Sequence, residues 1–284
     1  MPEHIQEMPN KETNFPLVSV CIPAYNCELH IQKTIRSVLN QSEKRLELVI
    51  IDDCSTDDTV IKIKEIDDPR IRLIQNDRNI GFLNNWNKAL DEARYTYVKL
   101  LSQDDLLDSG CLEQQIKALE HSKEKLAFVS CARAIINDQD RIIFLRSMGS
   151  VENGYLAPKD AIKRIVRSGA NPVGEPAAVL MRVDIAKKVG HFSQELIYTM
   201  DLDYWIRALE HGGLHYINKP LVSYRVHRHS QSVVMAKNQF FEYKKQLEKI
   251  MKTHPGLNGL DFYIGCFKSK INAYLRMLFY KIYA

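Results

Sequence analysis

Short apolar runs alternate with helical apolar repeats along the first 121 residues of this 284-residue chain. Runs rich in Val, Ile and Leu predict buried strands at 17–22, 46–51, 71–74 and 98–101. Apolar side chains that recur at helical spacing predict helices at 28–39, 56–66, 79–93 and 109–121. Strands and helices in this alternation form a mostly parallel sheet with right-handed crossovers.

The pattern is less regular beyond residue 121. Further strands are predicted at 127–131, 142–145, 177–181 and 221–228, and helices at 158–167 and 201–209. A turn-rich segment at 171–176 precedes the third of these strands and forms either a wall of an active site or a plain connection. The last strand leads to His227 and His229, and a single histidine in such a place is either structural or a metal ligand.

Acidic residues follow two of the early strands. Asp53 ends the second strand, and Asp104 and Asp105 end the fourth, so all three lie at the edge where parallel sheets bind ligands. Adjacent carboxylates repel each other, and an ordered pair needs a cation or hydrogen-bond donors. Mn²⁺ or Mg²⁺ prefers carboxylate oxygen and leaves positions open for phosphates, which predicts a nucleotide-diphosphate site. The alternative is local, with Asp104 in a turn and Asp105 or Asp108 capping the helix that begins near Ser109.

Composition narrows the class of protein. Hydrophobic residues make up 45% and charged residues 26%, as in ordinary globular proteins. Six scattered cysteines without a CxxC pair predict reduced thiols and a cytoplasmic protein. Residues 1–15 are polar and predicted to be disordered, and neither a signal peptide nor an uninterrupted membrane-spanning run is present. The sequence also has no recognisable nucleic-acid-binding motif. Because it has no phosphate-loop or dinucleotide-binding motif either, we expect a metal ion to contribute more to phosphate binding.

The tail differs from the rest of the chain in charge. Residues 237–284 hold nine Lys and Arg against three Asp and Glu. Apolar residues recur at helical spacing from Ile264 to Ile282, with basic residues among them. Such a helix either docks on the body or lies on an anionic membrane surface through residues 262–284.

Five segments, in order and spacing, resemble glycosyltransferase family 2. They are PLVSVCIPAYN (16–26), ELVIIDDCSTDDT (47–59), NIGFLNNWNKAL (79–90), LLSQDDLL (100–107) and DLDYWIRAL (201–209). The resemblance implies an α/β protein of the GT-A fold, with a Rossmann-like, mostly parallel central sheet flanked by helices. It places that domain at 16–232 and leaves 233–284 as a basic, amphipathic helical extension.

The resemblance also implies roles for single residues. Asp201 would be the catalytic base, and Asp105 with His227 would hold Mn²⁺ or Mg²⁺. Tyr25 would stack near the base and Asp53 would contact its imide edge. Residues expected to contact the nucleotide sugar are Pro23, Tyr25, Asn26, Asp53, Asn79, Asn85 and Asp104. Glu175 and Trp205 would lie on the acceptor side.

Two positions depart from the family pattern. Ser102 stands where many members have an additional acid, and Met200 precedes Asp201 where many have Glu. The second departure makes Asp203 an alternative base. Because helix residues two apart point to different sides, one of Asp201 and Asp203 is expected to face the cleft. Asp201 is favoured because it aligns with the aspartate of the motif.

The expected activity is inverting, metal-dependent transfer of a sugar from a nucleotide-diphosphate sugar to a hydroxyl of a glycan acceptor. The acceptor would be lipid-linked or an oligosaccharide of a bacterial O-antigen, capsule or cell-wall polymer. LSQDD and GEPAAVLMR are most similar to rhamnosyl- and related sugar transferases. The enzyme would be cytoplasmic, with peripheral attachment to the inner face of the membrane. A sugar-nucleotide pyrophosphorylase and a non-catalytic nucleotide-sugar-binding protein remain alternatives.

Overall fold

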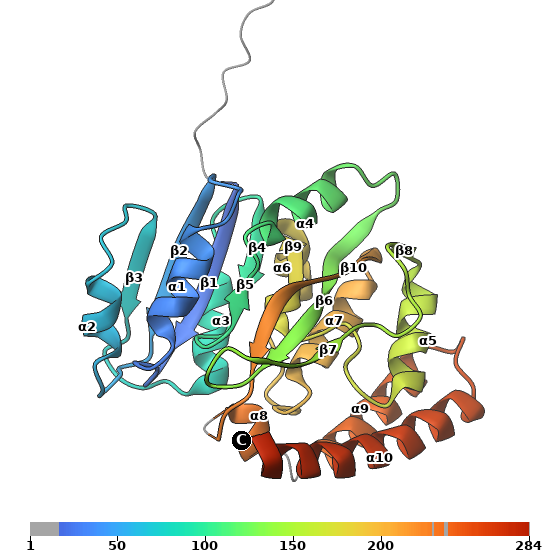
Figure 1. Ribbon diagram of the computed structural model, residues 1–284. Helices are drawn as coiled ribbons and strands as arrows, with labels where there is room; N and C mark the ends of the chain where they lie inside the picture. Colours follow the sequence, from blue (N-terminus) through green and yellow to red (C-terminus); the bar gives the residue numbers. More distant parts are fainter. Residues whose placement is uncertain (1–16, 229, 236–237, 284) are drawn as a thin grey trace, which may run out of the picture.

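The computed structural model describes residues 17–228, 230–235 and 238–283, and in it one sheet is covered by helices on both faces (Figure 1). The expected disordered segment 1–15 and His229 lie outside the described residues. The strands are β1 (Val18–Ala24), β2 (Leu46–Asp52), β3 (Ile71–Gln75), β4 (Tyr97–Leu100), β5 (Leu106–Leu107), β6 (Leu126–Ile136), β7 (Ile142–Arg146), β8 (Gly154–Leu156), β9 (Val179–Arg182) and β10 (Gly213–Arg225).

The first four strands form a parallel sheet in the order β3-β2-β1-β4. Every residue of β1 and β2 is buried, as continuous apolar runs in a covered parallel sheet require. The helices that follow these strands are α1 (Ile31–Leu39), α2 (Thr59–Lys64), α3 (Phe82–Asp91) and α4 (Cys111–Glu120). The apolar faces of α1 and α4 belong to one hydrophobic core, while that of α3 belongs to the core on the other face of the sheet.

The second half of the sheet is mixed. β9 runs antiparallel between β4 and β6, and β6 then pairs in parallel with β10. β5, β7 and β8 add antiparallel edges. The central helices of this half are α5 (Pro158–Ser168), η1 (Pro176–Ala178), α6 (Val183–Val189) and α7 (Met200–Leu209). Both α5 and α7 contribute to the same hydrophobic core as α3.

The strand expected at 221–228 is the end of β10, which begins at Gly213 and stops at Arg225. Three exposed residues, Asn218, Lys219 and Pro220, interrupt the apolar pattern there and hide the first half of the strand in the sequence. The pairing register with β6 also shifts on either side of Pro220. In a strand with such an irregularity, buried and exposed side chains do not alternate continuously, so the sequence pattern does not reveal the whole strand.

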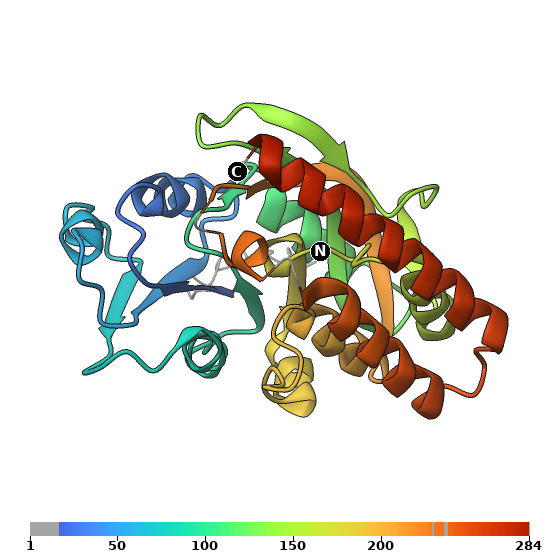
Figure 2. The same cartoon turned by 90° about the horizontal axis from the view of Figure 1, so that it is seen from below.

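The tail forms α8 (Gln231–Val234), α9 (Gln239–Thr253) and α10 (Gly259–Tyr283), and α10 packs against α5 and α9 (Figure 2). The buried face of α10 is formed by Asp261, Gly265, Ser269 and Ala273. Gly169, with φ 66°, ends α5 where the backbone of α10 passes, and a Cβ there would collide with Ser269. Small residues on both sides therefore allow close backbone approach.

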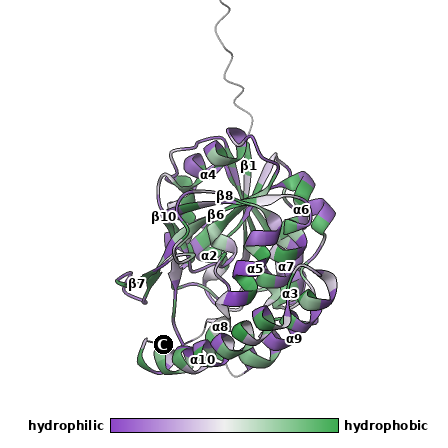
Figure 3. Cartoon of the chain, turned by 90° about the vertical axis from the view of Figure 1, so that its right-hand side faces the viewer, coloured by the Kyte–Doolittle hydropathy of each residue, from purple (hydrophilic) through white to green (hydrophobic). Residues whose placement is uncertain are grey.

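The rest of α10 carries many exposed apolar residues. Figure 3 shows hydrophobic and hydrophilic residues alternating along this helix. Tyr263, Phe267 and Ile282 are 72%, 68% and 72% exposed. The helix therefore docks on the body through its small residues and presents large apolar side chains outward. Among the described residues, no helix combines the length and the hydropathy needed to cross a bilayer.

Candidate active site

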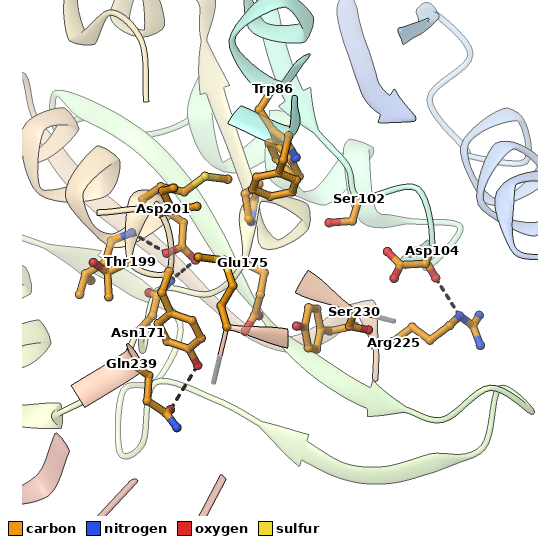
Figure 4. A pocket seen from close by; sticks show the side chains of 18 of the residues that line it. Trp86, Ser102, Asp104, Asn171, Glu175, Thr199, Asp201, Arg225, Ser230 and Gln239 are labelled. Carbon is orange, nitrogen blue, oxygen red and sulfur yellow. Dashed lines mark hydrogen bonds between the residues drawn. The ribbon is translucent and has the colours of Figure 1, made fainter. Parts of the chain in front are cut away.

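A cavity of about 640 Å³ opens beyond the carboxyl ends of β1 and β4. Its walls come from the β1–α1 loop, the start of α3, the β4–β5 loop, the segment that precedes η1, the start of α7 and one side of α10. Figure 4 shows Asp201 and Asp104 on opposite sides of this cavity, with Glu175 between them in the view. Acidic residues that are far apart in the sequence therefore face a common space.

The β1–α1 loop forms one end of the cavity, where Pro23, Tyr25 and Asn26 line the wall. Asn26 has a φ of 47°, and its side-chain oxygen accepts a hydrogen bond from the backbone N–H of Thr56 at 2.9 Å. The backbone of Tyr25 exchanges two hydrogen bonds with the side-chain amide of Gln103, at 2.7 and 3.1 Å. These contacts fix the loop and leave the Tyr25 ring exposed at the cavity.

Asp53 supports the neighbouring wall from inside. Its carboxylate accepts hydrogen bonds from the backbone N–H groups of Ile80 at 2.8 Å and Gly81 at 3.0 Å, and from the Asn76 side chain at 2.8 Å. These bonds hold Asn79 against the cavity, which Asp53 and Asn79 both line. Asp53 is only 2% exposed, so most of its hydrogen-bonding capacity is directed to the protein.

Asn85 also lines the cavity, although it is almost completely buried. Its side-chain amide donates to the backbone carbonyl of Ile51 at 3.0 Å. Its side-chain oxygen accepts a hydrogen bond from Asn76 at 3.2 Å. Asn85 therefore ties α3 to the end of β2, and its observed contacts are with the protein wall.

Asp104 and His227 meet at the far side of the cavity. The carboxylate of Asp104 and Nε2 of His227 are 2.8 Å apart, and both residues line the cavity. The ring of His30 lies beside that of His227, with 5.3 Å between centroids. The described residues contain no group of three or more His, Cys, Asp or Glu that could hold a metal. The Asp104–His227 pair supplies an oxygen and a nitrogen donor, which fits a divalent ion that keeps positions open for substrate phosphates.

Asp105 does not line the cavity, and its expected role as a metal ligand stays a prediction. The residue is 0% exposed, and one carboxylate oxygen accepts a hydrogen bond from the backbone N–H of Arg225 at 2.9 Å. Burial and the neighbouring charge of Asp104 raise the pKa of the Asp105 carboxyl well above its usual value. The second carboxylate oxygen of Asp105 has no hydrogen-bond partner among the described residues, whereas Asp104 lines the cavity.

Arg225 fixes which of the two adjacent acids faces the cavity. Its guanidinium donates to the carbonyls of Asp104 at 2.9 Å and Asn137 at 2.8 Å, and it forms an ion pair with Asp140 at 2.6 Å. The side chain of Arg225 is fully buried. The turn that presents Asp104 therefore depends on a residue 121 positions further along the chain.

Asp201 lies at the start of α7 and faces the cavity, as expected for the base. Its carboxylate accepts hydrogen bonds from the Asn171 side chain and from the backbone N–H of Leu202, both at 2.7 Å. Burial, followed by the negative charge of Glu175, raises the pKa of Asp201 to about 7. A carboxylate with this pKa is poised to take a proton near neutral pH.

Asp203 points away from the cavity. The side chain is 1% exposed and pairs with Arg207 and Lys249, each at 2.8 Å. Burial alone would raise the pKa of Asp203, but the hydrogen bonds from Lys249 and Arg207 hold it below its usual value. The expectation that one acid of this pair faces the cleft agrees with the geometry, and Asp203 is a structural ion-pair residue.

The two residues expected on the acceptor side have different positions. Glu175 lines the cavity and pairs with the buried Arg133 at 2.5 Å. Trp205 does not line the cavity, and the expectation fails there because its ring is 3% exposed in the core against Phe128. The indole N–H donates to the carbonyl of Gly174 at 3.0 Å. Trp205 thus supports the loop that carries Glu175 from behind.

Sequence reasoning missed one wall altogether. Arg146 of β7 and Arg276 of α10 both line the cavity, together with Tyr198 and Tyr280. Arg276 appeared in the sequence only as one of the basic residues of the tail. No local pattern reveals that α10 returns to the cavity, because the return depends on its packing against α5 and α9.

The family model for glycosyl transferase family 2 matches residues 19–190. The chain is 32% identical over 237 residues to TuaG of Bacillus subtilis (strain 168), which is named for teichuronic acid biosynthesis, and the match covers 81% of this chain and 88% of TuaG. It is 29% identical over 231 residues to the Escherichia coli enzyme WfgD, named as a UDP-Glc:alpha-D-GlcNAc-diphosphoundecaprenol beta-1,3-glucosyltransferase. That match covers 81% of this chain and 83% of WfgD.

Solved structures show the same fold. The Staphylococcus aureus TarS fragment 1–349 in complex with UDP-GlcNAc has a TM-score of 0.66 at 18% identity, over 83% of this chain and 66% of that one. This chain thus spans slightly less than two thirds of the TarS fragment. The mannosyltransferase PcManGT from Pyrobaculum calidifontis, in complex with GDP-Man and Mn²⁺, has a TM-score of 0.57 at 18% identity, over 93% of this chain and 70% of PcManGT. These likenesses establish the GT-A fold.

Proposed function

The chain belongs to glycosyl transferase family 2 and is a glycosyltransferase, and from this premise we propose that it transfers a sugar with inversion from a nucleotide-diphosphate sugar to a lipid-linked glycan. The observation that carries the proposal is the single cavity bounded by the Asp104–His227 pair on one side and Asp201 on the other. One side suits the charged leaving group, and the other suits the hydroxyl that attacks. The donor sugar would then lie between them, and the acceptor would attack it from the face opposite the nucleotide.

Asp201 acts as the base in this proposal. The hydroxyl of the acceptor gives its proton to the carboxylate as the oxygen attacks the anomeric carbon. Asn171 and the backbone N–H of Leu202 hold the carboxylate in place by the two 2.7 Å hydrogen bonds. Because one displacement suffices, the anomeric centre inverts and no covalent sugar intermediate forms on the protein.

Asp104 and His227 would hold Mn²⁺ or Mg²⁺ at the diphosphate of the donor. The ion would neutralise the charge that develops on the departing nucleotide. Their 2.8 Å approach and their place on the cavity wall support this assignment. PcManGT, whose structure contains Mn²⁺ and GDP-Man, is a relative in fold that also supports it.

The nucleotide would be bound by Tyr25 and Asn26 of the β1–α1 loop and by Asn79, which precedes α3. The exposed Tyr25 ring offers an apolar face for a base, and Asn26 and Asn79 offer polar groups at the same wall. Asp53 would act there mainly by fixing the 79–81 segment. The UDP-GlcNAc complex of TarS, a protein of the same fold, supports a nucleotide sugar as donor.

The acceptor and its setting are inferred from relatives and from the tail. WfgD takes a diphosphoundecaprenol-linked sugar by name, and TuaG is named for teichuronic acid biosynthesis. We infer a role in bacterial surface polysaccharide synthesis on the inner face of the cytoplasmic membrane. The exposed apolar side chains of α10, with Lys268, Lys270 and Lys281 beside them, suit an anionic membrane surface.

The test is a thermal-shift panel of nucleotide sugars with and without Mn²⁺. A donor at 100 times its dissociation constant should stabilise the protein by about 2.7 kcal/mol. The stabilisation should depend on the metal and disappear in Asp104→Ala. Asp108→Ala, which changes an exposed aspartate that follows β5 and does not line the cavity, is the control. Metal-dependent stabilisation that survives in Asp104→Ala would remove Asp104 from the site.

A further inference from the structure

Two arginines of the cavity have no role in the chemistry described above. Arg146 comes from β7 and Arg276 from α10, and both line the cavity. The side chain of Arg146 forms no hydrogen bond or ion pair with residues 17–228, 230–235 or 238–283. Arg276 donates a hydrogen bond to the hydroxyl of Tyr198 and lies over its ring. Within the described residues, neither guanidinium forms an ion pair with a carboxylate.

This part of the cavity carries an excess of positive charge. The largest effects on Arg146 are burial and the charges of Arg133 and Arg276, which lower its pKa to about 10, and it is still protonated at neutral pH. The carboxylate of Glu175 is already paired with Arg133 at 2.5 Å. Two guanidiniums that repel each other in a partly buried space are stabilised when an anion bridges them.

The position of the pair relates it to the acceptor rather than to the donor. Glu175 is close enough to both arginines for their charges to lower its pKa against the effect of burial. The same Glu175 raises the pKa of Asp201. The arginines are thus grouped with Glu175 and the base. Asp104, which pairs with His227, lies on the other side of the cavity from Asp201 (Figure 4).

β7 and α10 also carry exposed apolar surface next to these arginines. Ile142 and Leu145 of β7 are 63% and 61% exposed. The ring of Phe144 meets that of Phe279 of α10 edge to face, with 5.5 Å between centroids. The two arginines at the cavity wall therefore belong to two elements that also carry exposed apolar residues and touch through Phe144 and Phe279. A ligand that spans these regions has a sugar, an anion and an apolar chain in that order.

We propose that Arg146 and Arg276 bind the phosphate or diphosphate that joins the acceptor glycan to its lipid. This inference rests on the proposed glycosyltransferase function and adds a binding subsite to it. Planar guanidiniums suit this ligand because each can donate two parallel hydrogen bonds to phosphate oxygens. Held there, the phosphate places the first sugar of the acceptor beside Asp201 and directs the lipid toward the apolar faces of β7 and α10.

The test measures binding of geranyl diphosphate, geraniol and inorganic pyrophosphate to the full-length protein by calorimetry. EDTA in the buffer keeps diphosphates from binding through a divalent ion at the donor site. Arg146→Gln and Arg276→Gln should each weaken geranyl diphosphate binding by about 10- to 100-fold, since each removes charge-assisted hydrogen bonds. Geraniol should bind no variant measurably, and inorganic pyrophosphate should bind more weakly than geranyl diphosphate but with the same dependence on both arginines.

Matched controls come from the same two elements. Arg141 precedes β7 and Lys270 lies on the exposed side of α10, and neither lines the cavity. Arg141→Gln and Lys270→Gln should change the affinity by less than about twofold, because exposed charges act only through a screened field. Arg276→Gln can also loosen α10 through the lost Tyr198 contact, so melting temperature is measured for each variant. Arg146→Gln loses no hydrogen bond within the described residues. A loss of affinity in this variant therefore reports on ligand binding and not on loosening of α10.

Wild-type affinity for geranyl diphosphate in both Arg146→Gln and Arg276→Gln would overturn the proposal. Tighter binding of inorganic pyrophosphate than of geranyl diphosphate would overturn the lipid-linked source of the anion. Nucleotide-sugar binding with Mn²⁺, measured on the same protein preparations in buffer without EDTA, separates this failure from a failure of the proposed function. If the wild-type protein binds nucleotide sugars but substitution of either arginine leaves the affinity for geranyl diphosphate unchanged, only the proposed phosphate subsite is wrong.

Discussion

Asp201→Asn is the substitution that tests the proposed base most directly. The amide of asparagine has nearly the shape of the carboxylate, but its single oxygen can accept only one of the two hydrogen bonds that Asn171 and the backbone of Leu202 donate to separate carboxylate oxygens. It cannot take up the proton of the acceptor hydroxyl. The geometry of the cavity should therefore be kept while the chemistry is lost.

The expected loss follows from general-base catalysis. Positioned bases accelerate reactions by about 10²- to 10⁴-fold, which corresponds to about 3 to 5 kcal/mol of activation free energy. Turnover of Asp201→Asn should fall by at least that range, whereas affinity for the nucleotide sugar should change little. The melting temperature should not fall at pH 8, because the variant no longer buries an ionised carboxylate.

The pH dependence gives an independent measure. Only the ionised carboxylate acts as a base, so kcat/KM should rise about tenfold per pH unit below the pKa and level off above it. With the pKa of Asp201 raised to about 7, the bend should lie near neutral pH. Glu175→Gln removes a negative charge that raises this pKa and should move the bend to lower pH.

Asp203→Asn is the matched control, since Asp203 lies on the same helix turned away from the cavity. It should lower the melting temperature through the loss of the ion pairs with Arg207 and Lys249, and turnover per folded molecule should stay near wild type. Wild-type turnover in Asp201→Asn, or a flat kcat/KM between pH 6 and 8 in wild-type protein, would refute the assignment of Asp201 as base.

Three further outcomes follow from the structure. Asp104→Ala should abolish Mn²⁺-dependent binding of the nucleotide sugar in calorimetry, and retained metal-dependent affinity would argue against the Asp104–His227 site. Phe267→Asp on the exposed face of α10 should weaken salt-sensitive binding to anionic liposomes without lowering the melting temperature; Ile61→Asp on the distant α2 is the control, and equal liposome binding by both would exclude this face. Trp205→Phe should reduce stability by about 1 kcal/mol in denaturant titrations through the lost hydrogen bond to Gly174, while a raised KM for acceptor with full stability would restore Trp205 to the acceptor side.

The early strands and the edge they share could be predicted from the sequence. Continuous apolar runs at β1 and β2 specify buried parallel strands, and the acids that follow them must then converge at one edge. Asp201 could be placed at a helix start by the same local reasoning. The mixed second half was harder, because the exposed residues before Leu221 break the periodicity of β10.

Which acid of an adjacent pair faces the cavity could not be predicted locally. Asp104 and Asp105 have the same chemistry, and the choice depends on Arg225, which binds the backbone of one and the carboxylate of the other. Trp205 shows the same limit, since its helix position is compatible with either a cavity wall or the core. The arginine wall depends on the docking of α10 through Gly265, Ser269 and Ala273, which is a tertiary contact.

The most direct measurement is a product analysis with a panel of nucleotide sugars, Mn²⁺ and a prenyl-diphosphate-linked N-acetylhexosamine as acceptor. The anomeric configuration of the new linkage is read by NMR. We predict that a nucleotide sugar is consumed only when both the metal and the acceptor are present, and that the linkage is inverted relative to the donor. Retention of configuration, release of pyrophosphate from a sugar phosphate and nucleoside triphosphate, or no transfer to any such acceptor would contradict the account.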